Sequence, residues 1–217
     1  MPEKMLLHLC CGPCGEYPLE ILKSMEKYDI TLYFFNPNIQ PEKEWYRRLE
    51  GALRLAELRK LPIFVEEGCD PETWCSIGRT PARCAYCYES RMKRVAAFAR
   101  ENDFDIITTS LLVSPYQNKQ LIHQAGQRQA EKNAIEFLAA DFTEGFRKGQ
   151  QMARADGLYR QKYCGCMISL EDSDFLTKIE RDQAEYVIPQ KLRSELKAHT
   201  IIHKVFDLPQ IKNTVQI

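Results

Sequence analysis

Seven of the nine cysteines in this chain lie in three short motifs. The motifs are CCGPC with Cys10, Cys11 and Cys14, RCAYCY with Cys84 and Cys87, and YCGC with Cys164 and Cys166. Thiolates are preferred ligands of soft metal ions and iron–sulfur clusters, and thiols are rarely grouped in this way for packing alone. Because the motifs are far apart in the sequence, the fold must bring them together. We therefore expect an active site built around a metal.

Taken alone, the C-x-x-C motif fits half of a zinc site about as well as a redox-active dithiol or part of a cluster ligand set. The CCGPC motif changes this balance, because it follows a predicted strand where nucleotide-binding folds carry a phosphate-binding loop. Seven thiols also exceed the four that a tetrahedral zinc ion or one cubane cluster needs. The surplus favours a cluster together with a second metal or a redox-active pair able to form a disulfide bond.

Composition excludes several classes of protein. With 217 residues and 44% hydrophobic content, the chain can form one sizeable domain with a buried core. Its 30 basic and 30 acidic side chains give a formal net charge of zero, so no global positive field indicates a nucleic-acid partner. The apolar segment at the N-terminus is too short for a signal peptide, and no later run reaches the ~18 apolar residues of a membrane span. We expect a cytoplasmic protein without a membrane partner, in which paired cysteines bind metal or do redox chemistry.

Short β-like runs alternate with helical stretches along the chain. The predicted strands cover residues 5–10, 30–35, 63–65, 105–110 and 135–140, and the predicted helices cover 18–27, 41–60, 84–100, 117–132 and about 144–155. We expect Ser114 to cap the fourth helix, residues 68–83 to form a polar loop, and His8 to be a hydrogen-bonded core residue. The alternation predicts an α/β fold with a Rossmann-like parallel sheet. Residues 1–170 would form the catalytic domain, and 171–217 a small C-terminal extension.

Several candidate site residues follow the carboxyl ends of these strands. CCGPC follows the first strand, Asp70 follows the third, and Asp141 follows the fifth. Ligands of open α/β sheets bind beyond this edge. The topology therefore makes a shared site reasonable.

The order of the motifs carries a family resemblance. LLHLCCGPC, RCAYCYESR, TTSLLVSPYQ and then DF followed by LYRQKYCGC resemble the QueH-type epoxyqueuosine reductases, over about residues 5 to 170. The resemblance implies a fold similar to adenine-nucleotide hydrolase domains, a 4Fe–4S cluster bound by cysteines, and an additional iron held by cysteine and aspartate. Carried onto this sequence, the ligands are the seven motif cysteines, undivided between the two centres, with Asp141 as the first choice of aspartate and Asp70 as the second.

The implied reaction removes the epoxide oxygen of epoxyqueuosine at the anticodon wobble position of tRNA. It consumes two electrons from an unidentified donor and two protons, and it releases water. Tyr163 or water would supply protons. A tRNA thiolation enzyme is the runner-up, although its ATP-binding loop is absent, and a non-catalytic zinc-binding module is a third interpretation.

A tRNA substrate needs phosphate contacts despite the neutral total charge. Two basic stretches, 79–94 and 147–162, flank cysteine motifs and could form a positive rim around the site. The first contains Arg79, Arg83, Arg91, Lys93 and Arg94, and the second contains Arg147, Lys148, Arg154, Arg160 and Lys162. The plainer interpretation is two solvated helix faces.

Overall fold

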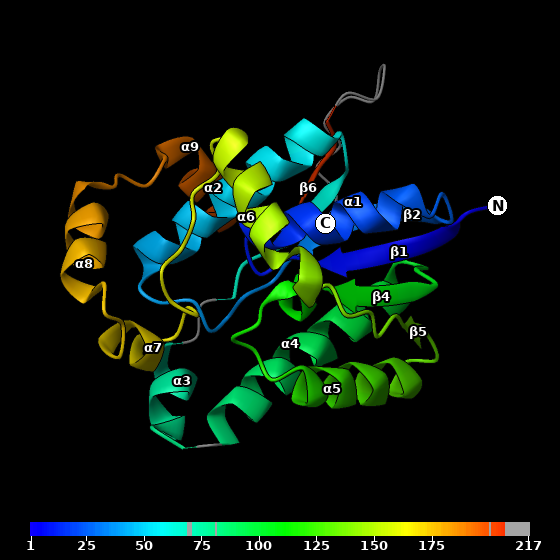
Figure 1. Ribbon diagram of the computed structural model, residues 1–217, viewed down its shortest axis with the longest axis horizontal. Coiled ribbons are helices and arrows are strands. Elements are labelled where there is room, and N and C mark those ends of the chain that lie inside the picture. Colours follow the sequence, from blue (N-terminus) through cyan, green and yellow to red (C-terminus); the bar gives the residue numbers. More distant parts are fainter. Residues whose placement is uncertain (69–70, 81, 200, 207–217) are drawn as a thin grey trace.

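A computed structural model describes residues 1–68, 71–80, 82–199 and 201–206, and it shows one sheet with helices on both faces (Figure 1). The strands, in spatial order, are β5 (Glu136–Phe137), β4 (Ile106–Thr109), β1 (Glu3–His8), β2 (Tyr28–Phe34), β3 (Ile63–Glu66) and β6 (Ile201–Lys204). The first five are mutually parallel, and β6 pairs antiparallel with β3. The order 5-4-1-2-3 confirms the Rossmann-like α/β fold.

The α-helices cover the sheet and connect its strands. They are α1 (Gly12–Ser24), α2 (Glu42–Arg59), α3 (Pro71–Ile77), α4 (Ala82–Glu101), α5 (Lys119–Lys132), α6 (Phe146–Ala155), α7 (Met167–Glu171), α8 (Leu176–Glu185) and α9 (Gln190–Ala198). Short 3-10 turns η1 (Ser110–Val113) and η2 (Thr143–Gly145) precede α5 and α6. In Figure 1, α1, α2 and α6 lie on one face of the sheet, and α4 and α5 lie on the other. In the part of the chain described here, none of the helices combines the length and apolar character needed to cross a membrane.

Local structure departs from the sequence predictions at four points. Helix α1 begins at Gly12, so the second half of CCGPC is helical rather than a loop, and Pro13 occupies a first-turn position that suits proline. A polar loop was predicted for 68–83, but it contains α3. Asn118, not Ser114, caps α5 by accepting a hydrogen bond from the backbone N–H of Leu121. The fifth strand is only two residues long, because this edge of the sheet pairs through Ile106 and Ile107 alone.

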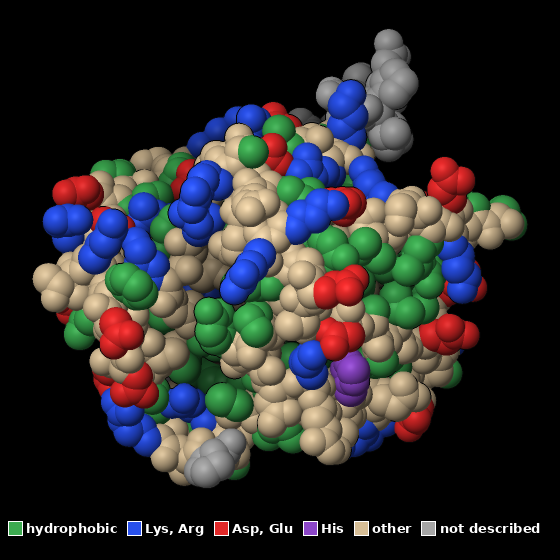
Figure 2. Space-filling model, in the orientation of Figure 1, with side chains coloured by type: hydrophobic (Ala, Val, Ile, Leu, Met, Phe, Trp, Pro, Cys, Tyr) green, Lys and Arg blue, Asp and Glu red, His purple; other side chains and the backbone are tan. Residues whose placement is uncertain are grey.

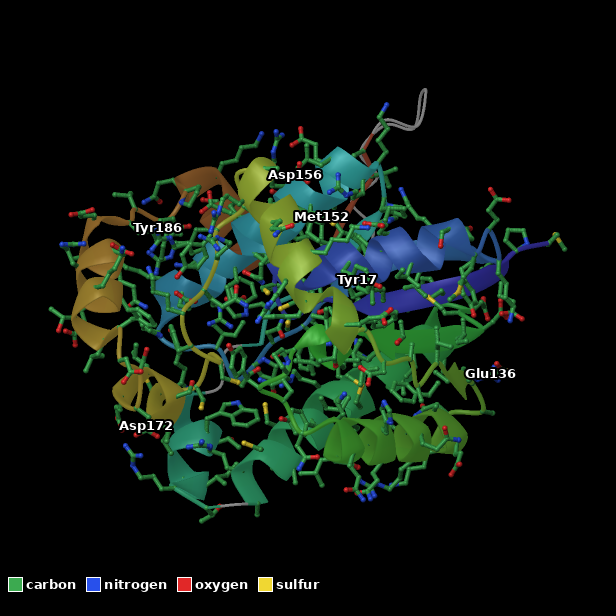
Figure 3. All side chains as sticks on the ribbon, viewed as in Figure 1. Tyr17, Glu136, Met152, Asp156, Asp172 and Tyr186 are labelled. Atoms are coloured by element: carbon green, nitrogen blue, oxygen red, sulfur yellow. The ribbon has the colours of Figure 1, made fainter. Side chains whose placement is uncertain are left out.

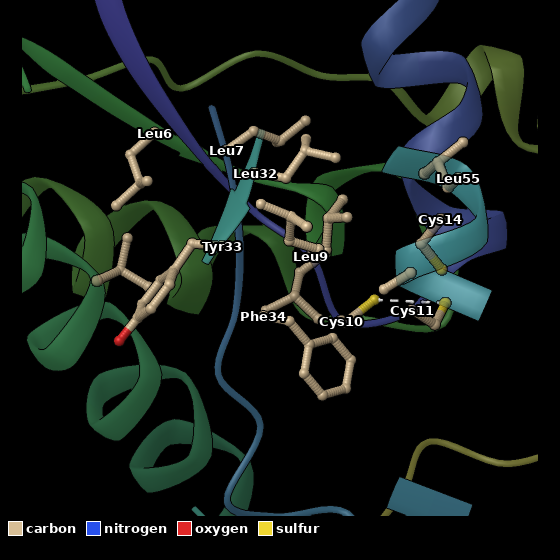
Figure 4. Packing of buried hydrophobic residues seen from close by; sticks show 14 of the residues in the cluster. Leu6, Leu7, Leu9, Cys10, Cys11, Cys14, Leu32, Tyr33, Phe34 and Leu55 are labelled. Atoms are coloured by element: carbon tan, nitrogen blue, oxygen red, sulfur yellow. Dashed lines mark hydrogen bonds between the residues drawn. The ribbon is translucent and has the colours of Figure 1, made fainter. Parts of the chain in front are cut away.

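The core lies against the central strands. Met5, Leu6, Leu7 and Leu32 have no exposed surface, since β1 is covered on both faces. Figure 4 shows the three cysteines of CCGPC at the end of this apolar row, beyond Leu9. These three ligand candidates therefore continue the core and are not part of a separate surface module.

Residues after 170 do not stand apart from the sheet. Strand β6 extends it beyond β3, and Leu192 and Leu196 of α9 belong to the same buried cluster as β1. A smaller cluster joins Tyr163 and Leu170 to Ile179 of α8. The division at residue 170 stays a prediction about folding units, while the packing shows that the C-terminal segment covers the edge of β3.

Candidate metal centre

The CCGPC cysteines follow β1, the strand at which the order of the strands in the sheet reverses. Strand β1 has β2 on one side and β4 on the other, so the chain leaves it at the topological switch point, where α/β folds bind ligands. The backbone N–H of Cys10 donates to Ser110 Oγ, 3.0 Å away, and Ser110 directly follows β4. The sulfur atoms of Cys10, Cys11 and Cys14 lie within 4.8 Å of one another and are buried. We call these three residues the thiol triad.

The thiol triad concentrates negative charge on one sulfur. Hydrogen bonds from Cys11 and then Cys14 lower the pKa of the Cys10 thiol well below its usual value. Burial raises the pKa of Cys11, and the hydrogen bond with Cys10 raises that of Cys14. The triad therefore favours one thiolate that accepts hydrogen bonds from two thiols. Gln161 Nε2 lies 2.8 Å from Cys11 Sγ and so contacts the triad from outside the CCGPC motif.

The other two motifs meet in a single pocket. Its lining residues are Asn38, Trp74, Arg83, Cys84, Cys87, Tyr88, Gln117, Cys164 and Cys166. Cys84 and Cys164 are exposed, whereas Cys87 is buried. Gln117 Nε2 lies 3.5 Å from Cys164 Sγ, and Gln117 Oε1 accepts from the Tyr88 hydroxyl at 2.8 Å. The structure thus gathers the four cysteines of RCAYCY and YCGC, which we call the four-thiol pocket.

A buried arginine links α4 to the sulfur atoms. Arg91 is 2% exposed, and its Nη2 lies 2.9 Å from Cys87 Sγ. Burial raises the pKa of Cys87 to about 12, and Arg91 opposes that rise. Burial, followed by the positive charge of Arg91, lowers the pKa of His8 to about 4. His8 is the hydrogen-bonded core residue that the sequence predicted, with ring nitrogens near Thr109 Oγ1 and the carbonyl of Phe35.

A second buried arginine fixes the YCGC motif. Arg48 on α2 forms a 2.7 Å ion pair with Glu44, and both side chains are almost fully buried. Its remaining nitrogens donate to the carbonyl oxygens of Tyr163 (2.9 Å) and Cys164 (2.8 Å). Gly165 follows with φ of +135°, a conformation that favours glycine, and its carbonyl accepts from the backbone N–H of Gln40. Helix α2 therefore holds the loop that presents Cys164 and Cys166.

Helix α6 brings the LYRQ segment to the thiol triad by packing on α1. Figure 3 shows Tyr17 of α1 beside α6, and the Tyr17 hydroxyl donates to Glu144 at 3.0 Å. Gly149 allows the close approach, because a Cβ there would lie 3.3 Å from Tyr17 Cβ. The chain then runs from α6 to Gln161, which contacts the triad.

The two aspartates and the tyrosine expected from the sequence have different settings. Asp141 is exposed, and a 2.7 Å bond from Lys119 and bonds from Thr143 lower its pKa to about 2. It is not among the mutually close donor atoms of the thiol triad. Asp70 lies outside the described residues. Tyr163 is buried, its hydroxyl donates to the carbonyl oxygen of Gln40, and it does not line the four-thiol pocket. The roles of all three stay predictions.

The first basic stretch is a poor candidate for the positive rim. Arg91 is buried against Cys87, Arg94 pairs with Glu66 and Glu101, and Arg79 pairs with Glu171 and Asp172. Three of the five basic side chains of residues 79–94 are therefore buried or paired, and the positive rim stays a prediction. In the second stretch, Lys148 pairs with Glu20 and Lys162 with Asp182. Arg147, Arg154 and Arg160 are exposed and form no ion pair with the residues that the structure describes.

Comparison with known proteins decides the family. The model of the family "Epoxyqueuosine reductase QueH" matches residues 5–172. This chain belongs to that family. A QueH from Histophilus somni is 33% identical over 79% of this chain and 74% of that protein, and a QueH from Acinetobacter baylyi is 31% identical over 79% and 83%. The family and enzyme class expected from the sequence, an epoxyqueuosine reductase of tRNA modification, are confirmed. A predicted tRNA methyltransferase subunit from Methanocaldococcus jannaschii overlaps with a TM-score of 0.46 at 12% identity, over 69% of this chain and 74% of that chain, which carries no information on function.

Four site residues escaped the sequence interpretation, namely Arg48, Arg91, Gln117 and Gln161. A sequence signal existed for three of them. Arg91 follows Cys87 by four residues, the spacing that puts two side chains on one helix face, and Gln161 lies inside LYRQKYCGC. Gln117 likewise ends the motif TTSLLVSPYQ, whereas Arg48 lies outside the motifs and reaches the cysteines only through tertiary packing.

Proposed function

We propose that this QueH protein reduces the epoxyqueuosine of tRNA to queuosine with iron held by its seven motif cysteines. One observation carries the proposal: chain folding gathers three distant motifs into two groups of free thiols. The thiol triad lies at the sheet's switch point, and the buried Arg91 lies against Cys87 of the four-thiol pocket. Family membership supplies the reaction that such a site performs.

The donor set fits the expected metals. Four cysteine thiolates are the usual ligand set of a 4Fe–4S cluster, and the four-thiol pocket supplies that number. The thiol triad supplies three more sulfurs, which would hold the additional iron and leave a position open for another ligand. Bound iron would supply one-electron transfer and Lewis acidity toward the epoxide oxygen. The disulfide expected of a redox-active pair is not confirmed, since the motif cysteines are all free in the structure.

Protein side chains control access to these sulfurs. Cys84 and Cys164 are open to solvent, so a nucleoside attached to a large RNA can approach the four-thiol pocket. Gln161 lies against the thiol triad and keeps its amide nitrogen on Cys11 and Cys14. Burial raises the pKa of the Tyr163 phenol, and its proton is held by the carbonyl of Gln40, so water is the better proton source. The choice of Asp141 or Asp70 as an oxygen ligand stays part of the proposal.

The tRNA would contact the face that carries α6. Figure 2 shows Lys and Arg side chains around a hollow on this face of the molecule. Arg147, Arg154 and Arg160 are available for phosphate groups. Tyr116 is 83% exposed, packs edge-on against Phe146 of α6, and precedes Gln117 of the four-thiol pocket. An exposed aromatic ring in this position would stack on an unpaired base of the anticodon loop. We place this activity in the cytoplasm, with an external electron donor.

Anaerobic reconstitution tests the proposal most directly. Iron and acid-labile sulfide would be measured in the wild-type protein and in Cys87→Ser, Cys11→Ser and Cys75→Ser variants, together with turnover of epoxyqueuosine-containing tRNA. We expect Cys87→Ser to lose sulfide and the broad absorbance near 400 nm, a region typical of iron–sulfur clusters. Cys11→Ser should retain sulfide, lose one iron and lose turnover.

Cys75→Ser is the matched control, because Cys75 lies outside the three motifs and should be dispensable. Full turnover by Cys87→Ser or Cys11→Ser would contradict the assignment of ligands. A colourless wild-type protein with stoichiometric zinc and no turnover would instead support a zinc-binding module.

A further inference from the structure

Arg91 is a buried cation without a carboxylate partner. It is 2% exposed, yet within the described part of the chain no Asp or Glu lies at ion-pair distance from it. Its Nε donates to the carbonyl of Cys87 at 3.3 Å, and its Nη2 lies 2.9 Å from Cys87 Sγ. The nearest group able to carry a negative charge is therefore a sulfur atom.

Two other arginines of the protein, unlike Arg91, have carboxylate partners. Arg48 is equally buried but pairs with Glu44, and Arg94, one helical turn beyond Arg91, pairs with Glu66. Burying a guanidinium without a counter-charge is costly, because desolvation disfavours the charged form. Arginine stays protonated in proteins, so the positive charge of Arg91 is buried against the sulfur of Cys87.

We propose that Arg91 is the built-in counter-cation of the metal centre and stabilises its more reduced state. The inference rests on the proposed metal site. A centre with several thiolate ligands is an anion, and each added electron makes it more negative. A fixed positive charge in a water-excluded interior favours the electron-rich form more than the same charge would in solvent. Arg91 is thus a positioning residue that sets how readily the centre accepts electrons.

Three variants separate charge from packing. Arg91→Met removes the charge and keeps most of the apolar volume of the side chain. Arg91→Lys keeps the charge but loses the guanidinium nitrogens that reach Cys87. Arg94→Met is the matched control, because it removes an arginine from the same helix that contacts carboxylates rather than sulfur. Each protein would be reconstituted with iron and sulfide, and its midpoint potential measured by an electron paramagnetic resonance-monitored titration. Binding of Co²⁺ alone, followed by thiolate-to-cobalt absorbance, gives a second readout that is independent of reductase activity.

We expect Arg91→Met to lower the equilibrium constant for one-electron reduction of the centre at least tenfold. This corresponds to a fall of about 59 mV in the midpoint potential. Its affinity for Co²⁺ should fall at least tenfold, and Arg91→Lys should lie between it and the wild type. Arg94→Met should lose thermal stability without a shift in potential. Equal potentials and Co²⁺ affinities in wild type and Arg91→Met would overturn the role of Arg91 while leaving the metal site intact. A wild-type protein that binds neither metal would overturn the proposed function as well.

Discussion

Replacing Arg48 by methionine should destabilise the fold and release the YCGC loop. The substitution removes a buried ion pair. Among the described residues it leaves Glu44, which has no exposed surface, with the Tyr159 hydroxyl as its one side-chain donor. It also removes the donors to the carbonyls of Tyr163 and Cys164. Breaking a buried pair by removing one partner costs about 3–5 kcal/mol. An unsatisfied buried carbonyl costs about 1–3 kcal/mol, and these costs overlap because they share one side chain.

We therefore expect Arg48→Met to lower the free energy of unfolding by roughly 4 kcal/mol, a large part of the ~5–15 kcal/mol typical of a folded domain. Urea unfolding of the metal-free protein measures this loss. The control is Arg54→Met on the same helix, because the Arg54–Glu57 pair is about half exposed on both sides. Exposed pairs of this kind contribute less than about 1 kcal/mol.

A double substitution tests the cause of the loss. Glu44→Gln removes the stranded charge, so Glu44→Gln with Arg48→Met should be more stable than Arg48→Met alone. If Arg48→Met costs no more than Arg54→Met, the buried pair does not anchor the loop. If the double variant shows no recovery, the uncompensated carboxylate is not the main cost.

The remaining predictions concern other parts of the molecule. The pKa of His8 is about 4 in the folded protein and 6.5 in the unfolded chain. Between pH 4 and pH 6.5 the unfolded chain therefore binds more protons than the folded protein. The unfolding free energy should therefore fall by roughly 3 kcal/mol as the pH drops through that window, and His8→Gln should flatten this dependence in urea titrations. Gly12→Ala should lower the melting temperature, since its Cβ would lie 2.4 Å from the carbonyl oxygen of Gly51 on α2. Tyr116→Ala should weaken binding of an anticodon stem-loop by about 1–3 kcal/mol, whereas Tyr116→Phe should bind normally. Arg147→Glu should weaken tRNA binding and reduce the slope of log affinity against log salt by about one, and an unchanged slope would remove Arg147 from the interface.

Much of the sheet could be predicted from the sequence because its strands are local apolar runs. Residues 5–10 and 30–35 were expected as strands, and β1 and β2 occupy nearly the same positions. The fifth strand was overestimated, because its contact with β4 ends at Leu138, whose N–H donates to the carbonyl of Ile107, while the apolar run continues to Ala140. β6 was not expected, since its pairing with β3 depends on packing of α9 rather than on local pattern.

The sequence predicted which cysteines could bind metal, but not how they divide into two groups. Cysteine spacing indicates metal binding wherever the motifs occur, and the family resemblance gave the reaction. Division into a thiol triad and a four-thiol pocket depends on where α4 and the YCGC loop lie, which no local pattern contains. The charge of a basic stretch was also misleading, because Arg91 and Arg94 face inward.

Helix starts give a common physical reason for the placement of all three cysteine motifs. Cys11 precedes the first residue of α1 and Cys14 lies in its first turn, Cys84 lies in the first turn of α4, and Cys166 precedes α7. Unpaired amides at a helix N-terminus carry partial positive charge, which would stabilise the negative charge of a metal bound by thiolates. In a chain with no net charge, helix starts and the buried Arg91 therefore place positive charge beside the motif cysteines.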